Sequence, residues 1–260
     1  MGYGNTEVFL SAEERETLIQ NYLGKTVEII VDRPIGYVHF TKGVTLHYTV
    51  NYGYIPHVMG GDGEEQDVYI LGVAEPLERF TGRIIAAVRR RDDNEDKFVA
   101  APEGMELHQA QIAEAIHFVE KYFDSTVDAL LRRSCGVIPY RKTGEGLRYL
   151  LLLQTNGFWS FPKGHMEAFE QETGTALREL KEETGLDAVL RSDIREMVSY
   201  PMGGGRVKQV VVFPGEVSGT VVLQKTEAVS RRWVTAQEAK RLLHPDFGPV
   251  MDRIQKTLEG

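Results

Sequence analysis

Cysteine is almost absent from this chain: Cys135 is the only one in 260 residues, so an internal disulfide is excluded. Cys135 opens the apolar segment CGVIPY, which favours a buried structural thiol over a nucleophile. The sequence also lacks an apolar run of about 18 residues and a signal-like N-terminus. We therefore expect a cytoplasmic protein with no membrane partner.

Positive charge is in deficit as well. The 30 lysines and arginines are outnumbered by 38 aspartates and glutamates, which gives a net charge of −8 without a long basic run. Proteins that hold DNA through its phosphates need a basic surface, so we expect no DNA partner. An acidic protein can still bind a polyphosphate when metal ions neutralise its carboxylates locally. The negative net charge is therefore compatible with a small-molecule nucleotide as the partner.

The chain has ample apolar material. With 260 residues, of which 42% are hydrophobic, it can fill two cores, and we expect two domains. The oligomeric state cannot be read from the sequence, and a homodimer is one alternative.

Residues 172–184 are predicted to form a helix. The segment contains no proline, consists mainly of helix-forming residues, and is followed by Gly185, which suits a left-handed C-terminal cap. At about 100° per residue its apolar stripe is formed by Ala176, Leu177, Leu180 and Thr184.

Three glutamates, Glu179, Glu182 and Glu183, lie on the arc beside this stripe. Carboxylates at such spacing repel one another, even on an exposed helix. A divalent cation with oxygen ligands offsets the repulsion, whereas the alternative is an ordinary solvated helix face. The preceding loop, residues 161–165, is a cationic turn that leads to the helix start, where free amides favour anions. The loop therefore favours the cation site.

The spacing of the fixed residues points to a known family. Gly164, five residues, Glu170, seven residues and then the run from Arg178 to Leu186 match the Nudix box at each fixed position. This half of the chain thereby resembles the Nudix hydrolases, in which the box is a loop–helix–loop that holds Mg²⁺ or Mn²⁺ against a diphosphate.

This resemblance implies roles for the residues of the box. The catalytic metal ligands would be Glu179, Glu182 and Glu183, with a main-chain carbonyl near Lys163 or Gly164 as a further ligand. Glu170 and Arg178 would be structural.

Residues around the box narrow the resemblance. Cys135–Ile138, the strand 150–154, the segment Trp159–Glu167 and Arg232-Trp233 are similar to the asymmetrical bis(5′-nucleosyl)-tetraphosphatases, which hydrolyse diadenosine tetraphosphate. Within that segment this chain has Lys-Gly-His at the position where many relatives have Gly-Gly. A late acidic residue of the subfamily matches Glu227, which would be a metal ligand or the base that activates water.

The substrate residues follow from the same resemblance. Lys163, a protonatable His165 and Lys208 would hold the polyphosphate, and an aromatic side chain such as Trp159 or Tyr200 would stack on a purine. The alternatives are a solvated surface lysine at Lys208 and core positions for the aromatic residues.

The expected reaction is attack by a metal-activated water on one phosphorus, which yields ATP and AMP. A glutamate, Glu183 or Glu227, would take the proton of the water. Alternative substrates are nucleoside triphosphates, nucleotide sugars and capped RNA. A nucleotide-sensing protein without turnover is the alternative from another class.

The first hundred residues have a different pattern. A capping box at Ser11 opens a helix that ends near Gly24, and short β-like segments follow at 27–31, 37–40, 45–50, 67–73, 82–88 and 98–100. Short strands at this spacing predict a small barrel or sandwich.

Residues 51–56 and 61–68 resemble the signature of the family I inorganic pyrophosphatases, which implies an OB-like five-stranded barrel. The second site implied by this resemblance consists of Tyr52, Asp62, Glu64 and Asp67. Glu64 replaces an aspartate of the family, and the phosphate-binding cations cannot all be placed. A degenerate structural or regulatory module is therefore favoured over a second, pyrophosphate-cleaving enzyme.

The expected architecture is α+β. The pyrophosphatase-like barrel domain spans 1–107, and connecting helices, one long or two in succession, span 108–133. The Nudix domain spans 134–260 and is expected to be an α/β/α sandwich. Its predicted strands are 135–141, 149–154, 189–200 and 208–217, and its later helices are 237–243 and 252–258.

Overall fold

The computed structural model describes residues 9–41, 43–224 and 226–259. The chain folds into two compact units. The N-terminal unit comprises the residues up to Leu131 together with Met202–Arg206, and the C-terminal unit comprises Arg132–Pro201 and the residues from Val207 onward. No helix in the described part of the chain is both long and apolar enough to cross a membrane.

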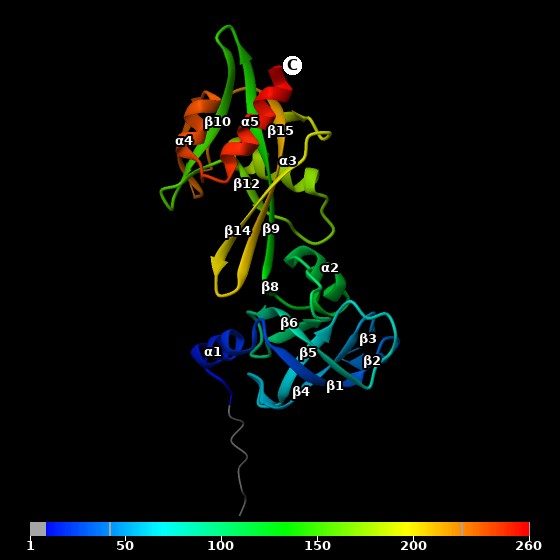
Figure 1. Ribbon diagram of the computed structural model, residues 1–260. Helices are drawn as coiled ribbons and strands as arrows, with labels where there is room; N and C mark the ends of the chain where they lie inside the picture. The colour runs from blue at the N-terminus through cyan, green and yellow to red at the C-terminus, as the bar shows by residue number, and fades with distance from the viewer. Residues whose placement is uncertain (1–8, 42, 225, 260) are drawn as a thin grey trace, which may run out of the picture. The chain divides into compact units, whose positions relative to one another are not determined.

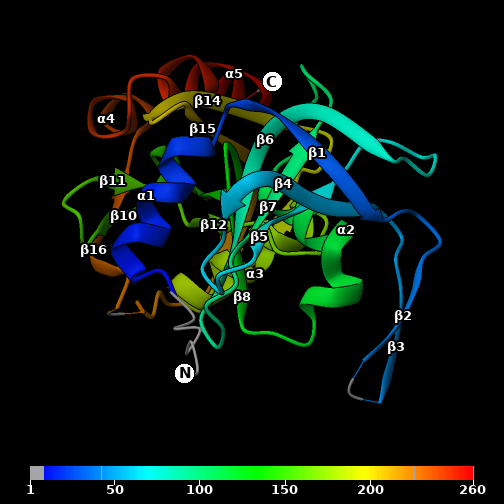
Figure 2. The same ribbon diagram turned by 90° about the horizontal axis from the view of Figure 1, so that it is seen from below.

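The N-terminal unit is built on a closed barrel of five strands, as the sequence predicts (Figure 2). The strands are β1 (Thr26–Arg33), β4 (Asn51–Met59), β5 (Glu65–Ile70), β7 (Lys97–Ala101) and β6 (Arg79–Arg90), in that order around the barrel. β6 closes the barrel by pairing with β1, and only the β5–β7 pair among these neighbours is parallel. Asn51–Met59, which the sequence reading left outside its predicted strands, is the nine-residue strand β4.

A helix and a hairpin flank this barrel. Helix α1 (Ala12–Tyr22) starts with the predicted capping box and buries Ile19 in one apolar cluster of the unit. The hairpin of β2 (Val38–Thr41) and β3 (Val44–His47) forms a separate two-stranded sheet and projects from the barrel (Figure 2).

The expectation of helices throughout 108–133 is wrong in its second half. Helix α2 (Gln109–Glu120) is present, but Ser125–Ala129 is the strand β8, which pairs with β6 (Figure 1). The β-branched Thr126 and Val127 suit a strand, and they lie opposite Arg89 and Val88. Pairing with a strand remote in sequence therefore outweighs the local helical pattern.

The C-terminal unit contains an eight-stranded sheet. Its main path is β11 (Trp159–Ser160), β10 (Gly146–Gln154), β9 (Leu131–Thr143), β15 (Arg206–Ser218) and β13 (Asp187–Leu190). Three further strands join it: β12 (Lys163–His165) pairs with β9, β14 (Glu196–Gly203) with β15, and β16 (Ala228–Val234) with β10. The predicted single strand 189–200 is thus two strands, and β16 was missed.

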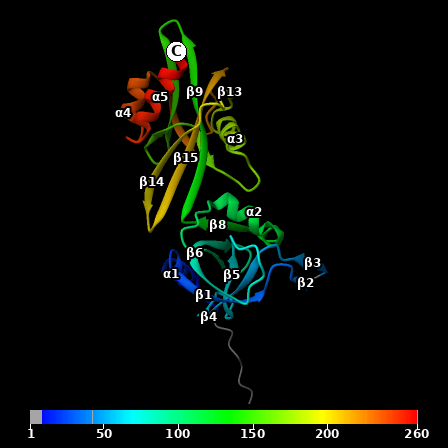
Figure 3. The same ribbon diagram turned by 45° about the vertical axis from the view of Figure 1, so that its right-hand side comes forward.

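Helices cover both faces of this sheet (Figure 3). On one face α3 (Glu172–Thr184) packs Ala176 and Leu180 against buried residues such as Cys135 and Leu150. On the other face lie α4 (Ala236–Leu242) and α5 (Phe247–Glu259), whose Met251 packs with sheet residues in a second cluster. This is the predicted three-layer arrangement, and it explains why β10 is apolar on both sides.

Candidate active site

Helix α3 occupies the predicted span and carries the central acidic residues. It ends at Gly185, whose φ of 70° is the left-handed conformation that glycine adopts readily, and the Gly185 N–H donates to the Lys181 carbonyl. The phase of the helix differs slightly from the prediction. Leu177 is 38% exposed, whereas Glu179 and Glu183 are buried.

A hub of charged hydrogen bonds ties the loop before α3 to the helix. The Arg178 guanidinium donates to both carboxylate oxygens of Glu170, at 2.7 and 3.0 Å, and to the main-chain carbonyl of His165 at 3.1 Å. Thr175 also donates to Glu170. These bonds, chiefly those from Arg178, hold the pKa of Glu170 at about 2.

Arg178 also binds two of the helix glutamates. Its Nη1 donates to Glu179 at 2.8 Å and to Glu182 at 3.2 Å. The Glu182 side chain is 53% exposed, so it lies at the margin of the site, in contrast to Glu179 at 11%.

Strand β12 brings the preceding loop against the helix. Lys163, Gly164 and His165 pair with Gly136, Cys135 and Ser134 of β9. A Cβ atom added at Gly164 would lie 2.1 Å from the Glu179 carboxyl carbon. Only glycine therefore permits this approach of main chain to carboxylate.

Most of the predicted site residues meet at one cavity of about 450 Å³. They are Lys163, Gly164, His165, Glu179, Glu183, Lys208 and Glu227. Glu227 is exposed on the segment before β16, and its carbonyl accepts from the main-chain N–H of Thr155. The fold thus brings together residues that are far apart in the sequence and belong to β12, α3, β15 and the segment before β16.

Glu183 has the most unusual environment in this cavity. It is 2% exposed, and its Oε2 atom has no hydrogen-bond partner. Burial raises its pKa to about 8 despite the opposing charge of Lys163, and Glu227 and Glu179 add repulsion. Burial likewise raises the pKa of Glu179.

The basic groups of the cavity are shifted in the opposite sense. Desolvation, and then the nearby Lys163, lower the pKa of Lys208 to about 8. Desolvation and the positive charges of Lys208, Arg132 and Lys163 lower that of His165 to about 4. The lowered pKa disfavours protonation of His165 in the chain as described, and the role of His165 toward a polyphosphate stays a prediction. Arg132 was missed because the sequence reading placed it in a connecting helix.

These residues fit a hard divalent cation. In the conformation described for residues 9–41, 43–224 and 226–259, no three His, Cys, Asp or Glu side chains are already grouped as a metal-binding cluster. The donor set nevertheless suits Mg²⁺ or Mn²⁺. Glu183 presents an unpartnered buried oxygen to the same cavity as Glu179 and Glu227, and oxygen is the ligand type these ions prefer.

An aromatic cavity of about 410 Å³ shares Lys163 and Gln154 with the acidic one. It contains both predicted stacking residues, Trp159 and Tyr200. The Tyr200 ring stacks on that of His244, with centroids 5.2 Å apart. His244 was not predicted, since its position just after α4 carries no motif.

The residues of the second predicted site, in the N-terminal unit, meet in two pairs, and their role as a site stays a prediction. Asp62 accepts from the Glu64 main-chain N–H in the β4–β5 loop, while Asp67 forms a 2.6 Å ion pair with Lys97. Burial opposes ionisation of the Asp67 carboxyl, but the nearby positive charge of Lys97 favours it. The pKa of Asp67 is therefore lowered. The Tyr52 hydroxyl is hydrogen-bonded to the Asp67 carboxylate, and Tyr52 also lines a cavity that includes Lys97.

The comparisons with known proteins concern the C-terminal unit. A family model described as NUDIX domain matches residues 130–254. The asymmetrical bis(5′-nucleosyl)-tetraphosphatase of Sus scrofa is 32% identical over 123 residues, which cover 42% of this chain and 83% of the relative. The Mus musculus protein of that name is 30% identical with the same coverage. A solved structure of a C. elegans Ap4A hydrolase binary complex is 25% identical with a TM-score of 0.47, and covers 50% of this chain and 98% of its own.

Proposed function

Since this chain belongs to the Nudix hydrolases, enzymes that act on phosphoanhydride bonds, we propose that its C-terminal unit cleaves a nucleoside polyphosphate, with diadenosine tetraphosphate preferred and ATP and AMP as products. The observation that carries this proposal is the pair of cavities that share Lys163. One offers carboxylates and cations to a polyphosphate, and the other offers stacked aromatic rings to a base. The pig and mouse relatives are named for the same activity.

The residues divide into three roles. Glu179 and Glu183 would hold the divalent cations, which when bound neutralise phosphate oxygens and make water more acidic. Lys163 and Lys208 bind the non-reacting phosphates, since both line the cavity. A main-chain carbonyl near Lys163 or Gly164 would add a further oxygen ligand.

The reaction needs a proton acceptor beside the attacked phosphorus. We assign this role to Glu227, and its position in the lining of the cavity and its exposure to solvent support the assignment. The water oxygen forms a new bond to phosphorus, the anhydride bond to the leaving phosphate breaks, and the proton of the water passes to the carboxylate.

A substrate panel tests the proposed function. The purified chain is incubated with diadenosine tetraphosphate, ATP, ADP-glucose, capped RNA or pyrophosphate in Mg²⁺, and the products are separated by anion-exchange chromatography. We expect the highest kcat/KM for diadenosine tetraphosphate, with ATP and AMP formed in equal amounts. Parallel reactions with EDTA should show no turnover. Preferential cleavage of the nucleotide sugar or of capped RNA would contradict the proposed substrate.

The aromatic cavity gives a separate prediction for substrate affinity. Tyr200→Ala should raise KM for diadenosine tetraphosphate roughly 5- to 100-fold and change kcat little, because base stacking is lost while the acidic cavity is intact. Tyr200→Phe keeps the ring and should behave as wild type. Steady-state kinetics on both variants check this, with thermal unfolding to confirm folding. An unchanged KM in the alanine variant would exclude Tyr200 from base binding.

A further inference from the structure

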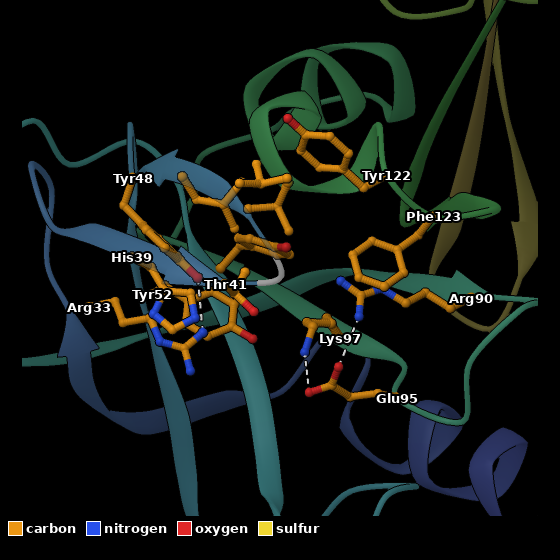
Figure 4. Close-up of a pocket in the computed structure, with 14 residues that line it drawn as sticks. Arg33, His39, Thr41, Tyr48, Tyr52, Arg90, Glu95, Lys97, Tyr122 and Phe123 are labelled. Carbon is orange, nitrogen blue, oxygen red and sulfur yellow. Dashed lines mark hydrogen bonds and ion pairs between the residues drawn. The ribbon is translucent and has the colours of Figure 1, made fainter.

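The N-terminal unit contains a cavity of about 440 Å³ that the proposed hydrolase reaction does not use. Its walls come from the barrel, the β2–β3 hairpin and the end of α2 (Figure 4). The volume lies in the range of about 300–1,000 Å³ that is usual for small-molecule sites. It is therefore large enough for a ligand rather than for water alone.

One end of this cavity is cationic. Arg33 donates a 2.9 Å hydrogen bond to the Tyr48 hydroxyl, and its guanidinium lies 4.9 Å from the centre of the Tyr52 ring. Lys97 lies 5.6 Å from the same ring. Both cations therefore converge on Tyr52.

Arg33 and Lys97 differ in how far they are neutralised. The Lys97 ammonium, 4% exposed, pairs with Asp67 and Glu95 at 2.6 Å each. Within the described residues the only carboxylate within 4.0 Å of Arg33 is that of Asp32, at 3.9 Å. That distance is too long for a hydrogen bond, and the Arg33 side chain is 31% exposed. Arg33 thus retains donors for an anion that enters the cavity.

The opposite end is apolar and aromatic. Figure 4 shows Tyr122 and Phe123 across the cavity from Arg33 and Tyr48. Tyr122 is 52% exposed, and the Phe123 ring packs 3.5 Å from the Arg90 guanidinium. Such a wall can hold a planar ring by stacking.

The lining charge favours an anion. Three of the described lining residues, Arg33, Arg90 and Lys97, are cations. Arg90 is paired with Glu120 at 2.7 Å and Lys97 with Asp67 and Glu95, so Arg33 is the one of the three whose charge is available to an anion. The polar side chains of His39 and Thr41 also line the cavity and add hydrogen-bonding groups.

We propose that this cavity binds a mononucleotide, with the phosphate on Arg33 and the Tyr48 hydroxyl and the base against Tyr122 and Phe123. Arginine suits phosphate because its planar fork donates two parallel hydrogen bonds. Asp67 and Glu95 are held by Lys97, so they leave the donors of Arg33 to the phosphate. This site is independent of the reaction proposed for the C-terminal unit.

Calorimetric titration of the full chain with AMP tests the proposal. Arg33→Gln should weaken binding at this site about tenfold or more, as expected when charge-assisted hydrogen bonds to phosphate are lost. Arg79→Gln is the matched control, because Arg79 is an exposed arginine of β6 that does not line the cavity. Equal AMP affinities in the two variants would overturn the proposal.

A second readout separates the two units. Both tryptophans, Trp159 and Trp233, belong to the C-terminal unit, so their fluorescence reports nucleotide binding there. We expect the fluorescence titration to be the same in wild type and Arg33→Gln, while the calorimetric one differs. A variant that changes both titrations alike would place the AMP site in the C-terminal unit and overturn the proposal.

Smaller probes test the two ends of the ligand. Adenosine and ribose 5-phosphate should each bind the Arg33 site more weakly than AMP, since each lacks one of the two recognised groups. Tyr48→Phe, which removes only the hydroxyl, should also weaken AMP binding, and thermal unfolding shows whether it is folded. Binding of ribose 5-phosphate as tight as that of AMP would contradict recognition of the base.

Discussion

Glu183→Gln should lower the rate of diadenosine tetraphosphate hydrolysis roughly 10²–10⁴-fold. The side chain is buried in the acidic cavity with an unpartnered oxygen, and glutamine keeps its shape but removes its charge. Loss of even an outer-shell partner of a metal costs about 10–100-fold, and loss of a positioned proton acceptor costs about 10²–10⁴-fold. A large effect is therefore expected whether Glu183 binds the cation or takes the proton. Initial rates at saturating Mg²⁺ measure it.

The matched control is Glu145→Gln. Glu145 lies in the exposed β9–β10 turn with a side chain that is 85% exposed, so the same change of charge should leave the rate within about twofold of wild type. Thermal unfolding should show that Glu183→Gln is about as stable as wild type, because burial raises the pKa of the Glu183 carboxyl to about 8, so that it is largely uncharged near pH 7 like the glutamine amide. Wild-type turnover in this variant would refute the proposed site.

Gly164→Ala should reduce hydrolysis by about 100-fold or more. The added methyl group would lie 2.1 Å from the Glu179 carboxyl carbon, so the carboxylate must move away and release Arg178. A displacement of about 1 Å in a reacting group can cost about 10²-fold in rate. The free energy of unfolding should fall by only about 1–3 kcal/mol, because one charged hydrogen bond is lost. Kinetics and denaturant unfolding separate the two effects.

Gly174→Ala provides the comparison within the same motif. Gly174 lies in the first turn of α3, and a Cβ atom there would meet nothing within 4 Å. Alanine should stabilise the helix by about 0.5–1 kcal/mol and leave the rate unchanged. If the two alanine variants lose activity equally, the close approach at Gly164 has no special part in the site.

The central helix could be predicted because its signals are local. Its bounds, its glycine cap and its glutamates follow from residues 172–185 alone, and the structure confirms the bounds and the cap. The exposure of single side chains could not be predicted as well. The Leu177 side chain faces solvent, and the Glu182 side chain accepts a hydrogen bond from Arg178. Packing against the sheet and the hydrogen bonds of Arg178 determine the rotation of the helix about its axis.

Features of the fold and of the site that depend on residues far apart in the chain could not be predicted from the sequence. β8 forms because β6 offers it a paired edge, and nothing within 125–129 identifies that strand as a partner. His244 lines the aromatic cavity just after α4, and the charge of Arg132 lowers the pKa of His165, yet neither residue belongs to a spaced motif. The spacing of the short strands and glycine turns predicted a small barrel or sandwich, and the five strands that the structure shows were implied by the pyrophosphatase resemblance. The pyrophosphatase resemblance stays a prediction.

The Arg178 hub has a consequence for how tightly the enzyme can hold its substrate. One guanidinium fastens Glu170, the His165 carbonyl and two helix glutamates in the chain without ligands. The loop therefore loses its conformational freedom when the protein folds. A flexible loop would lose conformational entropy when the polyphosphate binds, and this loss would weaken the affinity. In this protein the loop is already ordered, so that cost of binding is small.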